Sequence, residues 1–232
     1  MRLLKAVLFD FDNTLVDSAA VLPLARRRVA EEIVAYYGNS LDVEEVAQVV
    51  AWVEHVAERQ GLLDRDLIWE HVIHNLKVDS LPPSETLRRW SNIYWTEYAM
   101  GPLFPDTVSV LENLGRRYVL GVVTNTDGMP GMKMRRLEKS GLLKFFKAVV
   151  IAGEDVPETK PSPRPFLHAA KLLNVKPEEC IMVGDDPIND VLGAKSAGMY
   201  SVLLDKQGGK PYPVKPDHIV KSLRELLPLL DA

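Results

Sequence analysis

The amino-acid sequence predicts an α/β protein in which a doubly wound parallel sheet carries an inserted all-helical domain. Two observations support this fold class. Short runs rich in Val, Ile and Leu recur without strict polar alternation, and amphipathic segments of helical length separate them, as in parallel sheets buried on both faces. Between the first and second of these runs, residues 19–100 show helical patterns and no comparable strand.

The five predicted strands are apolar runs of the parallel-sheet type. They are expected at 6–10, 118–125, 147–155, 180–186 and 200–204. Helices are expected between them at 106–117, 132–139 and 163–173. Asp106 and Ser162 stand where helix caps are expected, and Pro163 suits a first helical position. This alternation of strands and helices favours a doubly wound sheet.

Residues 19–100 are predicted to form consecutive helices. Such an all-helical insertion suggests a separate lid domain. They are expected at about 22–37, 42–59, 64–76 and 84–99. The letters DVEE at 42–45 have the spacing of a capping box. An aromatic group is expected to form the core of this segment or a dimer contact, and it consists of Trp90, Tyr94, Trp95 and Tyr98. We therefore expect a core domain of residues 1–18 plus 101–232 and a helical lid of residues 19–100.

The composition is that of an ordinary globular protein. Of the 232 residues, 47% are hydrophobic and 26% are charged, and the net charge of -4 comes from 28 basic and 32 acidic residues. The basic residues form no concentrated patch, so no nucleic-acid partner is expected. The single cysteine, Cys180, excludes an internal disulfide and is expected to be inert. With neither a signal-peptide pattern nor a run long enough to span a membrane, the expectation is a cytoplasmic protein with no membrane partner.

Polar residues gather at the carboxyl ends of three predicted strands. In chain order they are Asp10 and Asp12, Thr124 and Asn125, and Asp185 and Asp186. The carboxyl ends of parallel strands meet at one edge of the sheet, which is where ligands bind. Several carboxylates can share one point when a hard divalent cation such as Mg²⁺ lies between them. The sequence therefore predicts a metal-assisted site at this edge.

Four short motifs, taken in order, resemble the signature of the haloacid dehalogenase superfamily. The letters DFDNT at 10–14 resemble its DxDxT motif, TN at 124–125 its Ser/Thr motif, KPSP at 160–163 its lysine segment, and GDDPIND at 184–190 its acidic motif. The resemblance covers essentially the whole chain. It implies a Rossmann-like core, a helical C1 cap inserted after the first motif, and hydrolysis of phosphate monoesters with Mg²⁺.

The resemblance also implies a role for each matching residue. Asp10 is similar to the nucleophile, which becomes a phosphoaspartyl intermediate. Asp12 is similar to the acid that protonates the leaving alcohol and then acts as a base on water. Phosphate binding would fall to Thr124, Asn125 and Lys160, and Mg²⁺ would be held by the carboxylates of Asp10 and Asp185 and the backbone carbonyl of Asp12.

The sequence departs from the family pattern at two positions. Asn13 stands where many relatives have Gly. Asp186 adds a second carboxylate directly beside Asp185. Whether Asp186 or Asp190 supports the metal site is left open.

The function predicted first is a Mg²⁺-dependent phosphatase for a small phosphorylated metabolite, acting as a monomer or a homodimer. A phosphosugar mutase would keep both aspartates of the first motif, so it remains an alternative. A 2-haloacid dehalogenase would not need a second acid, so Asp12 argues against it. A phosphonate hydrolase would use a lysine of the cap, where Lys77 is the sole candidate. The non-enzymatic alternative is a catalytically silent binding protein, which the complete set of motifs disfavours.

Overall fold

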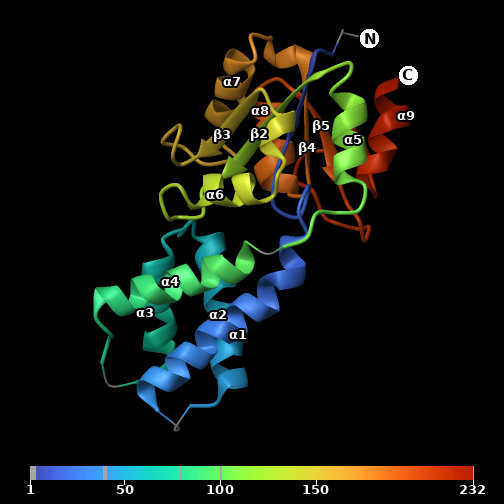
Figure 1. Ribbon diagram of the computed structural model, residues 1–232. Coiled ribbons are helices and arrows are strands. Elements are labelled where there is room, and N and C mark those ends of the chain that lie inside the picture. The colour runs from blue at the N-terminus through green and yellow to red at the C-terminus, as the bar shows by residue number, and fades with distance from the viewer. Residues whose placement is uncertain (1–3, 39–40, 79, 100, 232) are drawn as a thin grey trace. The chain divides into compact units, whose positions relative to one another are not determined.

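The computed structural model describes residues 4–38, 41–78, 80–99 and 101–231 (Figure 1). The chain forms two compact units. The core unit comprises Met1–Asp17, Leu103–Thr126 and Lys133–Ala232, and the helical unit comprises Ser18–Pro102 and Asp127–Met132. The domain limits expected from the sequence stay a prediction, and residue 100, the expected end of the lid, lies outside the described residues.

Across the described residues, the core unit is built on a six-stranded sheet in which every pairing is parallel. The strands are β1 (Ala6–Phe9), β2 (Val119–Asn125), β3 (Ala148–Ala152), β4 (Cys180–Gly184), β5 (Tyr200–Leu204) and β6 (His218–Val220). Their order is β3-β2-β1-β4-β5-β6, so β1 lies between β2 and β4. The predicted fold class is confirmed. The sequence does not predict β6, because this edge strand has three residues, of which two are exposed.

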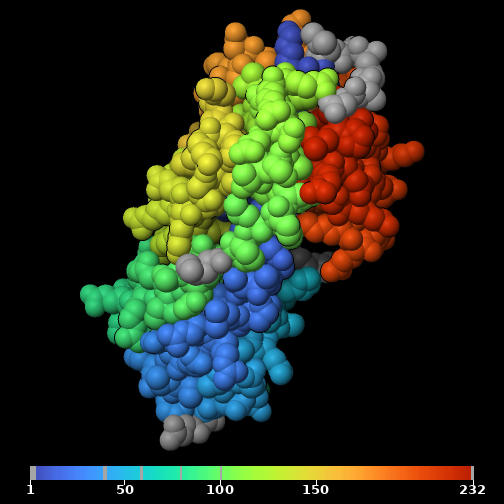
Figure 2. Space-filling view, turned by 45° about the vertical axis from the view of Figure 1, so that its right-hand side comes forward, coloured from blue at the N-terminus to red at the C-terminus, as the bar shows by residue number. Residues whose placement is uncertain are grey.

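Helices cover both faces of the sheet (Figure 1). They are α5 (Thr107–Leu114), α6 (Met132–Lys139), α7 (Pro163–Leu172), α8 (Gly193–Ser196) and α9 (Leu226–Asp231). Shorter turns lie between them: 3₁₀ turns at Leu143–Phe145, Pro177–Glu179 and Leu223–Glu225, and a π-helical turn, η3, at Pro187–Leu192. On one face, α5 and α9 lie side by side (Figures 1 and 2), and the Tyr118 hydroxyl donates a hydrogen bond to the Leu230 carbonyl at 2.7 Å.

Alternate residues of β1 point to opposite sides of the sheet, and both sides are covered. Val7 and Phe9 pack in a cluster with residues of α5, α6 and α9. Ala6 and Leu8 pack in another cluster with residues of α7 and α8. All four side chains are fully buried. Two-sided burial explains why the strand is a continuous apolar run in the sequence.

Two of the expected helix caps behave differently. The Ser162 hydroxyl accepts a hydrogen bond from the Arg164 amide at the start of α7, as expected of a cap. Asp106 occupies the cap position of α5, but its side chain makes no capping hydrogen bond. Its Oδ2 instead accepts the Arg224 amide at 2.9 Å. Asp106 therefore occupies the expected cap position, but its carboxylate binds a distant backbone amide and not the first turn of α5.

In the described part of the helical unit, the helices pack around an aromatic core. They are α1 (Ser18–Tyr37), α2 (Val43–Arg59), α3 (Arg65–Leu76) and α4 (Ser84–Tyr98). Trp69, Trp90, Tyr94 and Trp95 are all buried in its hydrophobic cluster. The expectation that the aromatic group forms the core of this unit is confirmed for Trp90, Tyr94 and Trp95, and Tyr98 packs against the cluster partly buried. Trp52 differs, with 57% of its surface exposed.

A buried ionic network lies inside the helical unit. Glu54 is 2% exposed and accepts hydrogen bonds from Arg26 Nε at 2.6 Å and from Arg65 Nη1 at 2.5 Å. The guanidinium of Arg65 also lies over the ring of Tyr94, 4.1 Å from its centroid. Burial of Glu54 is tolerated because both of its carboxylate oxygens bind cations.

Candidate active site

The strand order brings three predicted site segments together at one edge of the sheet. Asp10 directly follows β1, Asn125 ends β2, and Asp185 directly follows β4. Because β1 lies between β2 and β4, the three strand ends are neighbours. The Asp10 amide donates to the Val183 carbonyl at 2.9 Å, which continues the pairing of β1 with β4 up to the site. The expected meeting of these segments at the carboxyl edge is therefore observed.

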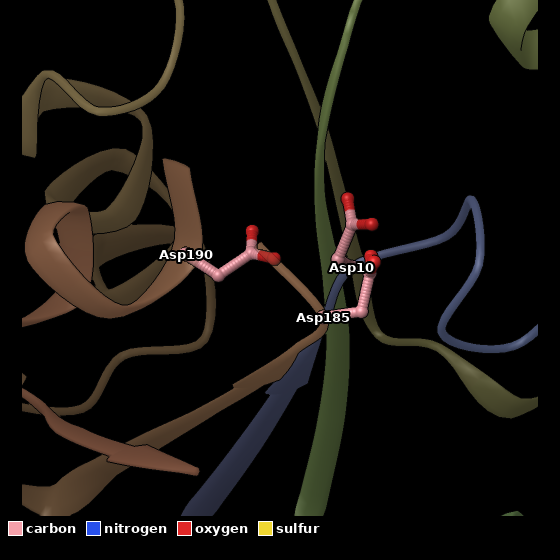
Figure 3. Close-up of side chains that lie close together, drawn as sticks. All are labelled: Asp10, Asp185 and Asp190. Carbon is pink, nitrogen blue, oxygen red and sulfur yellow. The ribbon is translucent and has the colours of Figure 1, made fainter. Parts of the chain in front are cut away.

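Three carboxylates converge at this edge. One carboxylate oxygen each from Asp10, Asp185 and Asp190 lies within 4.8 Å of the other two (Figure 3). Asp10 and Asp190 are buried, and Asp185 is partly buried. Such a set of hard oxygen donors is the kind that Mg²⁺ prefers.

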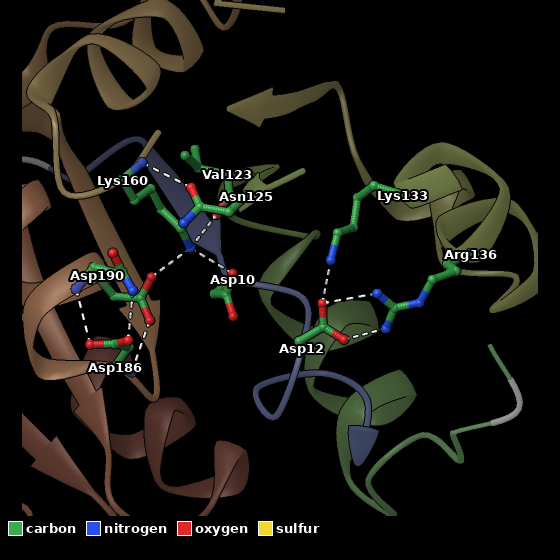
Figure 4. Close-up of polar contacts among 10 residues, drawn as sticks. Asp10, Asp12, Val123, Asn125, Lys133, Arg136, Lys160, Asp186 and Asp190 are labelled. Carbon is green, nitrogen blue, oxygen red and sulfur yellow. Dashed lines mark hydrogen bonds and ion pairs between the residues drawn. The ribbon is translucent and has the colours of Figure 1, made fainter. Parts of the chain in front are cut away.

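Lys160 lies between two of these carboxylates (Figure 4). Its ammonium donates to Asp10 Oδ1 at 2.6 Å, to Asp190 Oδ1 at 2.7 Å and to the Val123 carbonyl at 3.1 Å. The Asn125 side-chain oxygen accepts the Lys160 amide at 2.8 Å and so ties the end of β2 to the lysine segment. Burial alone would lower the pKa of Lys160, but the charges of Asp10 and Asp190 outweigh it and raise that pKa.

The carboxylate cluster carries more negative charge than Lys160 neutralises. Burial and the nearby charge of Asp10 raise the pKa of Asp190 to about 7, although Lys160 acts in the opposite direction. Burial and Asp10 also raise the pKa of Asp185. A divalent cation between these oxygens would relieve this repulsion, because positive charge favours ionised carboxylates. The residues present therefore fit a Mg²⁺ site.

Asp190, and not Asp186, lies in the cluster. The Asp186 carboxylate accepts the amides of Ile188 and Asn189 and so caps η3. Asp190 comes from the same turn and approaches β4 closely, because position 184 has no side chain. A Cβ on Gly184 would lie 2.6 Å from the Cβ of Asp190 and closer still to its carboxylate. Of the two candidates that the sequence left open, Asp190 is the one whose carboxylate lies beside those of Asp10 and Asp185.

The turn after β1 explains the departure at Asn13. This residue has a φ of 55°, in the left-handed region that glycine favours and asparagine tolerates. Its carbonyl accepts a hydrogen bond from the ammonium of Lys206. Asn13 therefore keeps the turn that a glycine would make.

The Asp12 carboxylate binds two cations of α6 (Figure 4). Lys133 Nζ lies 2.5 Å from Asp12 Oδ2, and the guanidinium of Arg136 donates to both Asp12 oxygens. Burial alone would raise the pKa of Asp12, but the charges of Arg136 and Lys133 outweigh burial and lower it well below its ordinary range. The sequence reasoning did not find these two cations.

Comparison with known proteins identifies the family. A family model described as haloacid dehalogenase-like hydrolase matches residues 4–198. The chain is 32% identical over 247 aligned residues to the phosphoglycolate phosphatase of Shigella boydii serotype 4 (strain Sb227), across 98% of this chain and 92% of that protein. The chain belongs to the haloacid dehalogenase-like hydrolase family.

Two further proteins are similar over nearly the whole chain. The N-acylneuraminate-9-phosphatase of Rattus norvegicus is 29% identical over 242 aligned residues, across 98% of this chain and 94% of that protein. The crystal structure of a haloacid dehalogenase (HAD) phosphatase from Thermococcus onnurineus superposes with a TM-score of 0.72 at 29% identity, covering 98% of each chain. These similarities confirm the resemblance drawn from the four motifs.

Family membership confirms that the chain is a hydrolase, with enzymes named as phosphatases among its relatives. The catalytically silent reading is thereby disfavoured. Among the described helices, none combines the length and the apolar character that crossing a membrane requires.

Two further site contacts also escaped the sequence reasoning. The ammonium of Lys210 donates to the Asp185 carbonyl at 2.6 Å and to its Oδ2 at 3.0 Å. Lys210 lies in the glycine-rich loop after β5, and a lysine in such a loop is expected to be exposed to solvent. For Lys133 and Arg136 a signal does exist, since their spacing of three residues places both on one face of a helix.

Proposed function

We propose that this protein is a Mg²⁺-dependent phosphatase that hydrolyses a small phosphate monoester through a phosphoaspartyl intermediate on Asp10. The observation that carries the proposal is the buried contact of Lys160 with Asp10 and Asp190 beside the carboxylate of Asp185. It supports a carboxylate nucleophile that is paired with a cation. The relatives named as phosphatases support the same reaction class.

In the first half-reaction, Asp10 acts as the nucleophile. A carboxylate oxygen of Asp10 bonds to phosphorus while the bond between phosphorus and the ester oxygen breaks. Asp12 gives a proton to the departing alkoxide, which leaves as the alcohol. Because Lys133 and Arg136 hold Asp12 as a carboxylate in this structure, Asp12 must leave these cations and take up a proton from solvent before this step. The positive charge of Lys160 lies next to Asp10, where it stabilises the negative charge on the phosphoryl oxygens. Thr124 and Asn125, at the end of β2, would bind and orient the phosphoryl group.

In the second half-reaction, Asp12 acts as a base. It takes a proton from water as the water oxygen bonds to phosphorus, and the bond between phosphorus and Asp10 breaks. Phosphate leaves, and both aspartates return to their starting protonation states. When bound, Mg²⁺ would neutralise and orient the phosphoryl oxygens, and the groups that would hold it are the carboxylates of Asp10, Asp185 and Asp190 and the backbone carbonyl of Asp12.

The helical segment 19–100 is proposed to act as the cap that encloses a small phosphorylated metabolite and sets specificity. A cytoplasmic location and a monomeric or homodimeric state remain part of the proposal, and the single cysteine supports a reducing compartment. A phosphosugar mutase would share the first half-reaction and differ in the acceptor of the phosphoryl group.

The proposal is tested by a screen of phosphorylated metabolites with Mg²⁺ present and free phosphate as the readout. We expect phosphate release from at least one small monoester, its loss with a chelator, and its return when Mg²⁺ is added in excess. A mutase would instead convert one sugar phosphate into an isomer without releasing phosphate. Full activity in the chelated protein would contradict the metal-assisted mechanism.

A further inference from the structure

The loop between β5 and β6 brings a second ammonium, that of Lys210, to the carboxylate cluster. Its Nζ donates to the Asp185 carbonyl at 2.6 Å and to Asp185 Oδ2 at 3.0 Å. Asp185 is one of the three residues whose carboxylate oxygens lie together, and Figure 3 shows its carboxylate beside that of Asp10. Lys210 therefore binds a carboxylate that the proposed function assigns to Mg²⁺.

A built turn places Lys210 at this position. Asp205, which directly follows β5 and is buried, accepts the Gly208 amide and the Lys210 amide, each at 3.0 Å. Gly208 and Gly209 have φ values of 80° and 88°, in the left-handed region that favours glycine. The turn therefore fixes the backbone at Lys210, and the Lys210 side chain can leave Asp185 without movement of the loop.

The two ammoniums of the cluster are held to different degrees. The Lys160 side chain is 3% exposed and binds two buried carboxylates, those of Asp10 and Asp190. The Lys210 side chain is 36% exposed and binds a single carboxylate, that of Asp185, whose side chain is 21% exposed. An ion pair that water reaches contributes little free energy, because water and salt screen the two charges. A dication that competes for Asp185 therefore displaces Lys210 far more easily than Lys160.

We propose that Lys210 is a tethered counter-cation that competes with Mg²⁺ for Asp185 and is released when the ion binds. The inference rests on the proposed function, in which Asp185 is a ligand of that ion. A Mg²⁺ ion and an ammonium on the same carboxylate would repel each other at close range. Three ionised carboxylates also match the combined charge of Lys160 and one dication, so a second ammonium would be in excess. Lys210 therefore raises the Mg²⁺ concentration at which the site fills.

A lysine that only orients a metal ligand would have the opposite effect on Mg²⁺ affinity. Outer-shell groups that orient ligands strengthen metal binding, and their loss typically weakens it ~10–100-fold. The loss of a competing cation strengthens metal binding, because one positive charge beside the ion is removed. The direction in which the Mg²⁺ dissociation constant changes therefore distinguishes competition from orientation.

The test measures the Mg²⁺ dissociation constant of the full chain by titration calorimetry, without substrate. We expect Lys210→Met to bind Mg²⁺ at least ~5-fold more tightly than the wild type, because it lacks the competing charge. Lys210→Arg keeps the charge and should stay within about twofold of the wild type. The matched control is Lys215→Met, which removes the same charge from an exposed position of the same loop and should also stay within about twofold.

The outcomes separate a failure of this inference from a failure of the proposed metal site. Unchanged or weaker Mg²⁺ binding by Lys210→Met would overturn the competition. Asp185→Asn tests the metal site itself and should bind Mg²⁺ at least ~10-fold more weakly than the wild type. If Asp185→Asn binds Mg²⁺ as tightly as the wild type, Asp185 is not a ligand, and the proposed metal site fails together with this inference.

Crystal structures of the wild-type protein supply a second readout that requires no variant. In crystals soaked in Mg²⁺, Lys210 Nζ should lie beyond hydrogen-bond distance of Asp185 Oδ2, whereas in crystals soaked in a chelator it should contact Asp185 as described above. The turn held by Asp205 should be the same in both. A Lys210 ammonium that still binds the Asp185 carboxylate beside a bound Mg²⁺ would overturn the inference.

Discussion

Lys160 donates a hydrogen bond to Asp10 at 2.6 Å, although 150 residues separate the two in sequence. The contact joins the first motif, after β1, to the segment that enters α7, and both side chains are buried. The same ammonium holds Asp190. Lys160 therefore connects the proposed nucleophile and the acidic cluster through its side chain, and Asn125 through its backbone amide.

Lys160→Met should abolish most of the activity. The substitution keeps the length of the side chain but removes the cation between two buried carboxylates, so we expect a loss of at least ~10²-fold in kcat/KM for phosphate release. Lys171→Met is the matched control, because Lys171 is an exposed lysine of α7. A Lys160→Met protein that kept more than a tenth of the wild-type kcat/KM would show that this ammonium is dispensable.

Asp190 should behave as a metal ligand, and Asp186 should behave as a structural cap of η3. Asp190→Asn should weaken Mg²⁺ binding at least ~10-fold in titration calorimetry, because it removes a charged oxygen donor from the cluster. Asp186→Ala should leave Mg²⁺ affinity within about threefold and lower the free energy of unfolding by ~1 kcal/mol, the typical cost of a lost helix cap. The reverse pattern would place the ligand at Asp186.

The buried network around Glu54 should stabilise the helical unit. Glu54→Gln leaves the buried cation of Arg65 without its charged partner, so we expect a loss of ~3–5 kcal/mol in the free energy of unfolding. Glu31→Gln is the control. Glu31 pairs with Arg27 and Arg28 on the surface of α1, and such pairs contribute ~0–1 kcal/mol. Equal effects in urea unfolding would mean that Glu54 contributes no more than a surface pair.

The thiol of Cys180 should be unreactive in the folded protein. Burial and the charges of Glu179 and Glu178 raise its pKa to about 12, so the thiol stays protonated below that pH, and the thiolate is the reactive form. Alkylation by iodoacetamide at pH 8 should be slow in the native protein and reach the rate of an ordinary thiol in denaturant. Rapid alkylation of the native protein would show that Cys180 is accessible as a thiolate.

The sequence predicted those parts of the site that depend on strand ends. Asp10, Asn125 and Asp185 each follow or end an apolar run, and parallel strands bring such ends to one edge whatever the details of packing. Alternate residues of a strand point to opposite sides of the sheet. A continuous apolar run therefore predicts that both sides are buried.

The remaining site residues depend on tertiary structure that local patterns do not contain. Lys133 and Arg136 share one face of α6, but their burial and their contact with Asp12 depend on how α6 packs in the folded protein. The choice between Asp186 and Asp190 depends on the π-helical turn η3 and on the missing side chain at Gly184. Sequence spacing alone does not distinguish an acidic cap from an acidic ligand four residues later.

Asp10 is proposed as the nucleophile and Asp12 as the acid and base. Substrates with different leaving groups distinguish these two roles. Asp10→Asn removes the attacking charge, so it should lose at least ~10³-fold in rate on every ester. Asp12→Asn should lose ~10²–10⁴-fold on alkyl phosphates. A nitrophenyl phosphate should restore the first half-reaction of Asp12→Asn, because its leaving group does not require the proton.

The most direct measurement mixes Asp12→Asn rapidly with a nitrophenyl phosphate and Mg²⁺, quenches with acid and analyses the peptides by mass spectrometry. The mechanism predicts a burst of one nitrophenolate per active site, with one phosphoryl group on the peptide that contains Asp10. The double variant Asp10→Asn, Asp12→Asn should show neither. Nitrophenolate release without a phosphorylated Asp10 peptide, or a burst that survives in the double variant, would contradict Asp10 as the nucleophile.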